Sequence, residues 1–209
     1  MSVSYISNGN APKTKLLVFG NSITLHGVAP DIGWNGCWGM AASKPENDFV
    51  HKLISMLEPS YGPVLCCVAQ GAEWERHYHD AGSIEMYSEA RNFNPDIVVI
   101  RIGENIPDGD MNDYPLEPYF EKMIDYLSPG KDAVKIVTDM FWRNAAKNEA
   151  AEKAAANTNS RFVSLTDLGD SEENMAVGLF EHSGVAHHPG DLGMLRIAER
   201  LFAAINKAY

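Results

Sequence analysis

Residues 16–27 read LLVFGNSITLHG, and this stretch decides which fold the chain can adopt. Its first half, Leu16 to Phe19, is a short apolar run of the kind that forms a buried strand. The run stops at Gly20, Asn21 and Ser22, where glycine permits a tight turn and a small hydroxyl follows. A strand that ends in this way puts the Ser22 hydroxyl at the edge of a sheet.

Further apolar runs follow the first one along the chain, and longer amphipathic segments separate them. We expect strands over residues 15–19, 64–69, 96–102, 135–140 and 161–165, and helices over about 46–58, 73–91, 116–128, 145–157 and 190–208. This alternation predicts one α/β domain over residues 1–209, with a five-stranded, mostly parallel sheet. The third run, PDIVVIRIG, is rich in β-branched residues, which favours a central strand covered on both faces.

Composition excludes several classes of partner. The formal net charge is −11, and the basic residues are scattered, whereas nucleic acids and anionic membranes require clustered lysine and arginine. No run approaches the ~18 apolar residues of a membrane span. The first residues also lack the order of a secretory signal. We therefore expect no nucleic acid and no membrane as partner, and a cytoplasmic protein, or a periplasmic or secreted one if a leader segment was removed.

Groups suited to catalysis follow the predicted strands. In a parallel α/β sheet, ligands bind beyond the carboxyl ends of the strands. Ser22 follows the first strand, Gly71 the second and Asn105 the third, and His187 and His188 precede the last helix. A hydroxyl, a glycine amide, an asparagine amide and an imidazole are together the components of an acyl-transfer site: a nucleophile, donors for a developing oxyanion, and a general base.

Four blocks of the sequence carry a resemblance to a known family. The blocks VFGNSIT, VAQGAEW, RIGEN and HHPGDLGM occur in this order within residues 16–195. They resemble the GDSL or SGNH hydrolases, a family of esterases and lipases named for a serine, a glycine, an asparagine and a histidine in separate blocks. Those residues correspond to Ser22, Gly71, Asn105 and His188, whereas Asn21 stands where the family more often has aspartate. The resemblance implies a three-layer α/β/α, flavodoxin-like fold.

The resemblance also implies a mechanism. Ser22 would attack an ester carbonyl while His188 takes its proton, and the oxyanion would be bound by the amides of Ser22 and Gly71 and by the Asn105 side chain, without a metal or another cofactor. The expected substrate is a small-molecule ester that loses a short acyl group, acetyl above all, with an acetylated sugar among the candidates. A lysophospholipase or acyl-thioesterase with the same site, and a non-catalytic carbohydrate-binding relative, are the alternatives. The oligomeric state is left open.

The group that orients the histidine is not evident in the sequence. The family usually has an aspartate three residues before the histidine, but this position is Val185. Glu181, Asp191, Glu73 and a backbone carbonyl are the alternatives, because the role requires only an acceptor for the ring N–H. We favour His188 over His187 as the base, because His188 precedes a proline as in the family pattern.

Aromatic residues near the predicted strand ends suggest a substrate-binding wall. Trp34 lies in the long loop over residues 27–45, and Trp74 and Trp142 follow strands, so all three are candidates for stacking on a sugar ring.

Two other features have competing interpretations. His77, His79 and Asp80 lie close together, but their spacing does not match a helical metal motif, and a solvated helix face is the favoured interpretation. Arg143 either binds a substrate carboxylate or pairs with the acidic surface.

Overall fold

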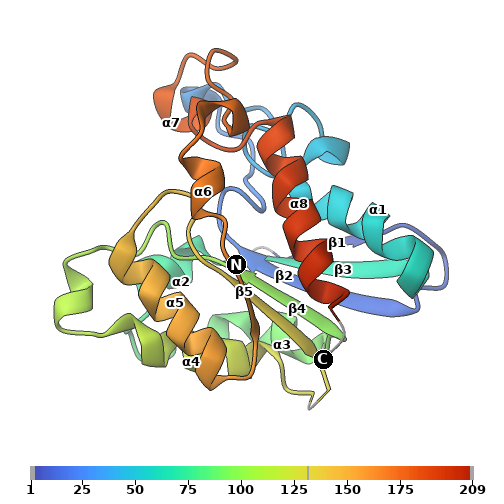
Figure 1. The fold of residues 1–209 in the computed structure, drawn as a ribbon, viewed down its shortest axis with the longest axis vertical. Helices are drawn as coiled ribbons and strands as arrows, with labels where there is room; N and C mark the ends of the chain where they lie inside the picture. Colours follow the sequence, from blue (N-terminus) through green and yellow to red (C-terminus); the bar gives the residue numbers. More distant parts are fainter. Residues whose placement is uncertain (1–2, 131, 208–209) are drawn as a thin grey trace.

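The computed structural model describes residues 3–130 and 132–207 and has a three-layer α/β/α architecture (Figure 1). A six-stranded sheet with the order β1-β3-β2-β4-β5-β6 forms the middle layer. Its strands are β1 (Val3–Ser7), β2 (Thr14–Gly20), β3 (Val64–Gln70), β4 (Ile97–Arg101), β5 (Val134–Thr138) and β6 (Arg161–Val163). The helices are α1 (Phe49–Tyr61), α2 (Ala72–Arg76), α3 (Ser88–Asn92), α4 (Leu116–Leu127), α5 (Ala145–Asn157), α6 (Thr166–Gly169), α7 (Ser183–Ala186) and α8 (Asp191–Ile205).

The α/β class and the mostly parallel sheet are confirmed, but the number of strands is corrected from five to six. β2 to β6 are the predicted strands and pair in parallel, with β2 between β3 and β4. β1 adds an antiparallel edge, in which Val3 pairs with Ala69 and Ser7 with Leu65. The sequence of β1, VSYIS, has no continuous apolar run because an edge strand buries only part of its side chains. Its pattern was therefore too weak to predict a strand.

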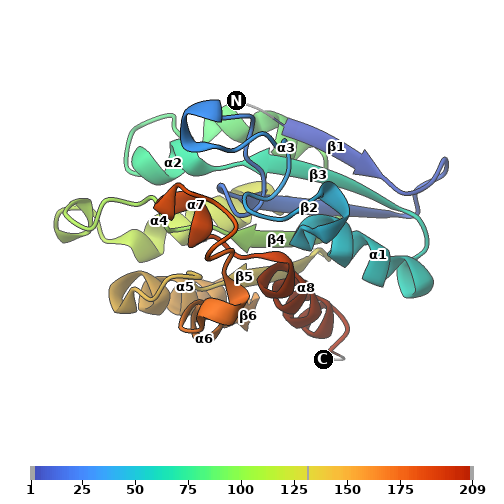
Figure 2. The same ribbon diagram turned by 90° about the horizontal axis from the view of Figure 1, so that it is seen from above.

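Two apolar cores lie on opposite faces of the sheet (Figure 2). α1 and α8 pack side by side against one face, where Leu16 and Val18 of β2 are fully buried. The other face is covered by α2 to α5 and receives Leu17 and Phe19 of the same strand. β2 is thus buried on both sides, and Ser22 immediately follows a rigid strand.

The short helices α6 and α7 were not predicted, and the largest departure from the predicted helices lies between residues 73 and 91. There the structure has α2, a 3-10 helix (Glu85–Tyr87) and α3 instead of one long helix. Gly82 has a φ of 86° and interrupts the helical path. α1 begins later than predicted because the Asp48 side chain accepts a hydrogen bond from the backbone N–H of His51 and caps the helix at that point. It also continues to Tyr61, past the predicted end at residue 58. Ala208, within the predicted last helix, lies outside the described residues.

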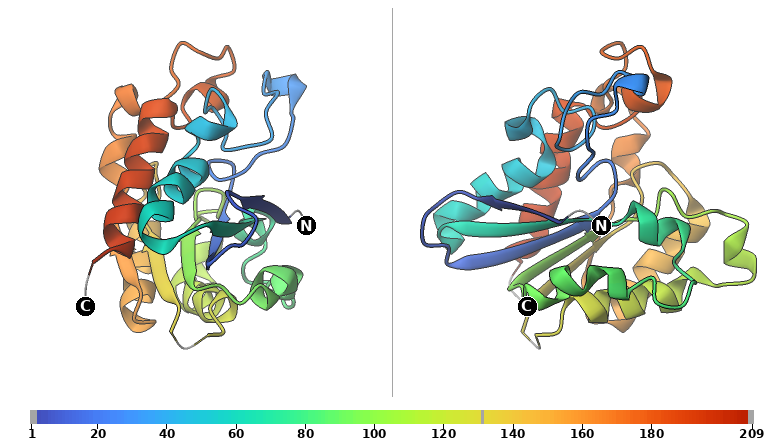
Figure 3. Two further views of the ribbon diagram at one scale, coloured as in Figure 1. Left: turned by 90° about the vertical axis from the view of Figure 1, so that its right-hand side faces the viewer. Right: turned by 180° about the vertical axis from the view of Figure 1, so that it is seen from behind.

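Two long loops lie together beyond the carboxyl ends of the parallel strands, at the top of Figures 1 and 3. One follows β2 and the other contains α7 and precedes α8. A third apolar cluster joins them, in which Trp34 and Met40 of the first loop pack with Ala176 and Val185 of the second. Among the described residues, no helix combines the length and the apolar character needed to cross a membrane.

Candidate active site

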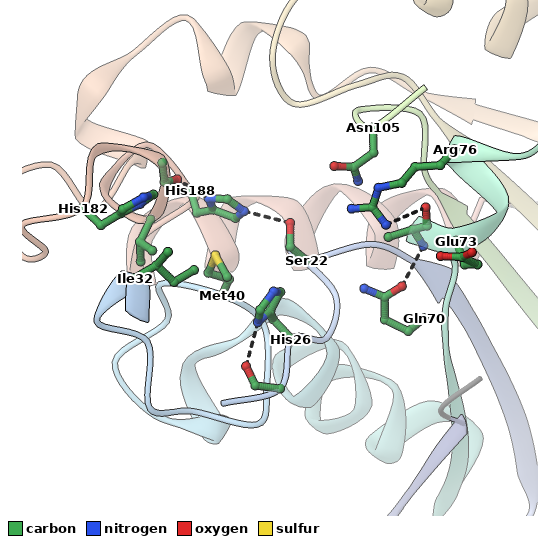
Figure 4. A pocket seen from close by; sticks show the side chains of 14 residues that line it. Ser22, His26, Ile32, Met40, Gln70, Glu73, Arg76, Asn105, His182 and His188 are labelled. Carbon is green, nitrogen blue, oxygen red and sulfur yellow. Dashed lines mark hydrogen bonds between the residues drawn. The ribbon is translucent and has the colours of Figure 1, made fainter. Parts of the chain in front are cut away.

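The structure brings Ser22 and His188 together at the carboxyl edge of the sheet, although they are far apart in the sequence. The Ser22 hydroxyl oxygen lies 2.8 Å from Nε2 of His188, within hydrogen-bond distance (Figure 4). Ser22 comes from the turn after β2, and His188 from the turn between α7 and α8. A hydroxyl that donates to an imidazole nitrogen is arranged for proton transfer to that nitrogen.

A backbone carbonyl, not a carboxylate, orients the His188 ring. Nδ1 of His188 lies 2.6 Å from the carbonyl oxygen of Gly184, one helical turn earlier. Because a carbonyl only accepts, Nδ1 carries the proton and Nε2 presents its lone pair to the Ser22 hydroxyl. Of the four alternatives, the backbone carbonyl is therefore correct. Asp191 instead accepts hydrogen bonds from the Ser43 backbone N–H and hydroxyl, and neither Glu181 nor Glu73 contacts the ring.

Burial keeps His188 neutral. Desolvation lowers the pKa of His188 to about 4, and the positive charge of Arg101 acts in the same direction. The Trp142 ring system packs against the imidazole in a T-shaped arrangement, with ring centroids 5.0 Å apart, and contributes to this burial. A neutral imidazole is the form required of a general base at pH 7.

His187 lies outside this arrangement. It is exposed, and its Nδ1 lies 2.7 Å from the backbone carbonyl of Ser183. The structure therefore gives the contact with Ser22 to His188 alone.

Two of the three predicted oxyanion donors are available in the structure. The backbone N–H of Ser22 has no acceptor among the described residues. Nδ2 of Asn105 donates one of its protons in a short hydrogen bond to Oε2 of Glu75, which leaves the second proton for another acceptor. Asn105 lies on the opposite side of Ser22 from His188 (Figure 4).

The third predicted donor, the amide of Gly71, is already bonded. It donates to the carbonyl oxygen of Gly20 over 2.6 Å, which extends the pairing of β2 and β3. A Cβ at this position would lie 2.4 Å from Cδ1 of Ile102 and 2.7 Å from Cζ of Phe19. Gly71 is therefore required by the close packing at the end of β3, and the prediction that its amide binds the oxyanion is corrected.

Beneath Ser22 and Asn105 lies a buried charge cluster made of Asn21, Glu75, Arg101 and Glu104. Asn21, Glu75 and Arg101 are 0% exposed. Arg101 donates to Oε1 of Glu104 from Nη1 (3.1 Å) and Nη2 (2.5 Å), and its Nη2 also donates to Oδ1 of Asn21 (3.0 Å). The guanidinium thus pairs directly with Glu104, and Asn21 links it to Glu75.

The pKa values of the two carboxyl groups move apart in this cluster. Burial and the negative charge of Glu104 raise the pKa of Glu75. Burial also acts to raise the pKa of Glu104, but the Arg101 guanidinium and the Phe141 backbone N–H outweigh it and lower that pKa.

The same cluster explains why residue 21 is asparagine. Nδ2 of Asn21 donates to Oε1 of Glu75 (2.9 Å) and to Oε2 of Glu104 (2.5 Å). An aspartate would place a third carboxylate beside the other two, with one guanidinium for all three. The amide removes that repulsion and supplies donors that bridge the two acids.

A cleft of about 540 Å³ opens beside Ser22. Its two sides differ in character: Ile32 and Met40 lie on the side of His188, and Gln70, Glu73 and Arg76 form a polar side (Figure 4). Val185, which also lines the cleft, packs in the same apolar cluster as Met40. The remaining lining residues are Ser22, His26, Gly27, Ala72, Asn105, His182, Gly184 and His188.

The aromatic wall predicted from the sequence does not line this cleft. Trp34 is 3% exposed and packs in the cluster that joins the two loops, and Trp74 is 1% exposed in the core beneath α2. Trp142 is partly exposed, but its contact is with the His188 ring. Trp34 and Trp74 are buried in apolar clusters because burying such large side chains is favourable.

Arg143 also lies outside the cleft, in a surface ion pair with Asp170. Of its two interpretations, pairing with the acidic surface is the correct one.

The sequence left three site features unassigned: which backbone carbonyl orients His188, namely that of Gly184, then Glu75, and the pair Arg101–Glu104. Backbone carbonyls carry no residue-specific signal, so no motif could reveal the first. Arg101 does give a signal, because a charged residue in the apolar strand PDIVVIRIG must find a buried partner. Glu104 lies three residues further on, within the block that contains Asn105.

Comparisons with known proteins agree with this geometry at the level of the fold. No family model matches the sequence, and no curated protein sequence matches it. Solved structures do match over most of the chain. A lipase/acylhydrolase from Enterococcus faecalis has a TM-score of 0.60 and 16% identity, covering 92% of this chain and 95% of that one.

Two further structures are similar. The esterase EstA from Pseudoalteromonas, solved with monoethylphosphonate as inhibitor, has a TM-score of 0.56 and 12% identity, covering 92% of this chain and 96% of its own. A family two carbohydrate esterase from Cellvibrio japonicus has a TM-score of 0.56 and 17% identity, covering 94% of this chain and 62% of its own. With Ser22, Asn105 and His188 at the carboxyl edge of its parallel sheet, the chain has the fold of the SGNH hydrolases.

Proposed function

We propose that this protein is a serine ester hydrolase that removes a short acyl group, with acetyl as the preferred size, from a carbohydrate or another small polar alcohol. The observation that carries the proposal is the 2.8 Å contact between the Ser22 hydroxyl and Nε2 of His188, with the ring held by the Gly184 carbonyl. A hydroxyl bonded to an oriented, neutral imidazole is the arrangement that activates serine as a nucleophile.

The reaction follows from these contacts. His188 Nε2 takes the Ser22 proton as the hydroxyl oxygen attacks the ester carbonyl carbon. The negative charge that develops on the carbonyl oxygen is bound by the Ser22 N–H and the free proton of Asn105 Nδ2. The C–O bond to the alcohol then breaks, and the alcohol leaves with the proton from His188. Water then attacks the acyl carbon while His188 takes one of its protons. The bond between the acyl carbon and the Ser22 oxygen breaks, the serine oxygen takes the proton from His188, and the acid is released.

The two sides of the cleft support the proposed substrate. The apolar side chains of Ile32, Met40 and Val185 suit a short acyl group, and they belong to loops that close the cleft near His188. The polar side offers an amide, a carboxylate and a guanidinium, from Gln70, Glu73 and Arg76, to the hydroxyl groups of a sugar. The similar structure from Cellvibrio japonicus is described as a carbohydrate esterase, which agrees with this choice.

Covalent labelling with a fluorophosphonate probe tests the nucleophile. The wild type should be labelled on the peptide that contains Ser22, and Ser22→Ala should remove labelling and ester hydrolysis together. Ser55→Ala is the matched control, because Ser55 is exposed on α1 and its hydroxyl donates to the carbonyl of His51 in its own helix. An unlabelled wild type would instead support a binding protein without hydrolase activity.

Chain-length profiling of p-nitrophenyl esters tests the substrate class. We expect kcat/KM to be highest for acetate and to fall by at least about tenfold for octanoate, because Ile32, Met40 and Val185 offer a small apolar surface for an acyl chain. A preference for octanoate would favour the lysophospholipase alternative and contradict the acetyl assignment.

A further inference from the structure

The carboxylate of Glu75 lies directly behind Asn105, on the side away from the cleft. Glu75 is on α2, 0% exposed, and does not line the cleft. Its Oε2 accepts the hydrogen bond from Asn105 Nδ2. Among the described residues this carboxylate is the only hydrogen-bond partner of the Asn105 side chain, so Asn105 depends on Glu75 for its orientation.

Glu75 is itself held on several sides. Its Oε1 accepts from the backbone N–H of Gly103 (2.5 Å) and from Nδ2 of Asn21 (2.9 Å). These donors come from the ends of β4 and β2, so the carboxylate ties together the two strand ends that carry Asn105 and Ser22. A buried carboxylate with three N–H donors is rigid, which is what a support for a catalytic amide requires.

We propose that Glu75 is a positioning residue that aims the Asn105 amide at the oxyanion site. This inference rests on the proposed function, because the oxyanion forms only during acyl transfer. Glu75 acts through Asn105 and does not touch the substrate. Its effect is therefore on the transition state, where the oxyanion is charged, and not on binding of the neutral ester.

A double-mutant cycle tests the proposal with Glu75→Gln, Asn105→Ala and the combination. Glutamine keeps the size of the side chain but has one oxygen, so it cannot accept from Asn105 on one side and from Gly103 and Asn21 on the other. Removing an oxyanion donor costs about 10²- to 10³-fold in kcat. We expect Glu75→Gln to lower kcat on p-nitrophenyl acetate by about 10- to 100-fold, with KM changed less than about threefold.

The combined variant decides between a positioning role and a general structural role. If Glu75 acts through Asn105, Glu75→Gln should lower kcat by no more than about threefold once Asn105 is alanine. Losses that multiply in the double variant, or an unchanged kcat in Glu75→Gln, would overturn the proposal. Glu85→Gln is the matched control, because Glu85 is exposed and lies outside the cleft.

A measurement on the wild type covers the case in which Glu75→Gln does not fold. In a ¹H–¹⁵N spectrum, one side-chain amide proton of Asn105, assigned by its absence in Asn105→Ala, should be shifted downfield and exchange slowly with water, because it is bonded to a carboxylate. Two fast-exchanging protons would overturn the proposal. A wild type without hydrolysis or labelling would instead refute the proposed function, so the two failures are distinguishable.

Discussion

His188 and His187 are adjacent in the sequence, but only His188 contacts Ser22. Loss of a general base lowers turnover by about 10²- to 10⁴-fold. We therefore predict a loss of this size in kcat for His188→Ala and a change of less than about twofold for His187→Ala. Hydrolysis of p-nitrophenyl acetate measures both, and equal losses would contradict the assignment of the base.

The pH dependence of the reaction should reflect the burial of His188. The base is active when neutral, and desolvation lowers its pKa to about 4, so it stays active as the pH falls through 6.5 and is lost only near pH 4. We predict that kcat/KM is nearly constant from pH 8 to about pH 5 and is half-maximal near pH 4. An acid limb centred near pH 6.5 would show that the histidine is not desolvated. Tryptophan fluorescence at each pH separates titration from unfolding.

Among individual residues, the sequence predicted those whose side-chain type is required for acyl transfer. Ser22, Asn105 and His188 were predicted as neighbours, and the structure brings them to one edge. A backbone carbonyl was one of the alternatives for the orienting group, but the sequence did not select it because a main-chain atom has no residue-specific signal. The aromatic wall was wrong because Trp34 and Trp74 pack in apolar clusters. The position of a large apolar side chain depends on the tertiary packing of the whole fold, which the local sequence does not show.

The first turn of α8 supports the turn that carries His188. The carbonyl of Asn174 accepts from the Gly190 backbone N–H over 2.9 Å, and the carbonyl of His188 accepts from the N–H of Ala176 over 3.0 Å. At Gly193, a Cβ would lie 2.1 Å from the carbonyl oxygen of Asn174. The helix and the loop around Asn174 are thus in backbone contact, and this contact holds His188 in position.

We predict that Gly193→Ala destabilises the protein and lowers its activity. Separating two packed backbone segments costs about 1–3 kcal/mol and shifts the turn before α8. Thermal unfolding should show a lower Tm, and kcat should fall at temperatures where the variant is folded. Gly109→Ala is the control, because a Cβ at Gly109 would meet no atom within 4 Å. A Gly193→Ala variant as stable and active as wild type would contradict this account.

A helix with a continuous helical pattern could be predicted from the sequence, whereas a helical segment interrupted by turns could not. α5 has the predicted bounds, because residues 145–157 form a continuous helical pattern between an asparagine cap and a turn. The segment 73–91 was also predicted as one helix, but its path is broken near Gly82, and Tyr78 and Ile84 on either side are buried in the core. Tertiary packing decides such a break, so local periodicity does not reveal it.

For the whole molecule, β1 covers one edge of the sheet and closes both cores. Ile6 packs against the core under α1 and α8, and Val3 packs against the opposite one. We predict that a chain lacking residues 1–7 has a lower Tm and self-associates as its concentration rises, because β3 becomes an exposed edge. Light scattering after size-exclusion chromatography measures the association. A truncated chain that stays monomeric with an unchanged Tm would show that β1 is dispensable.

The acceptor for the His188 Nδ1 proton is a main-chain oxygen, and this choice has evolutionary consequences. A carboxylate in that role would be neutralised in strong acid and erased by a single codon change. The carbonyl of residue 184 does not titrate, and it persists whichever amino acid is encoded there. The drawback is that an uncharged oxygen offers less electrostatic support to a transient imidazolium. If the proposed function holds, the orientation of His188 therefore depends on the shape of one helical turn rather than on the identity of a third side chain.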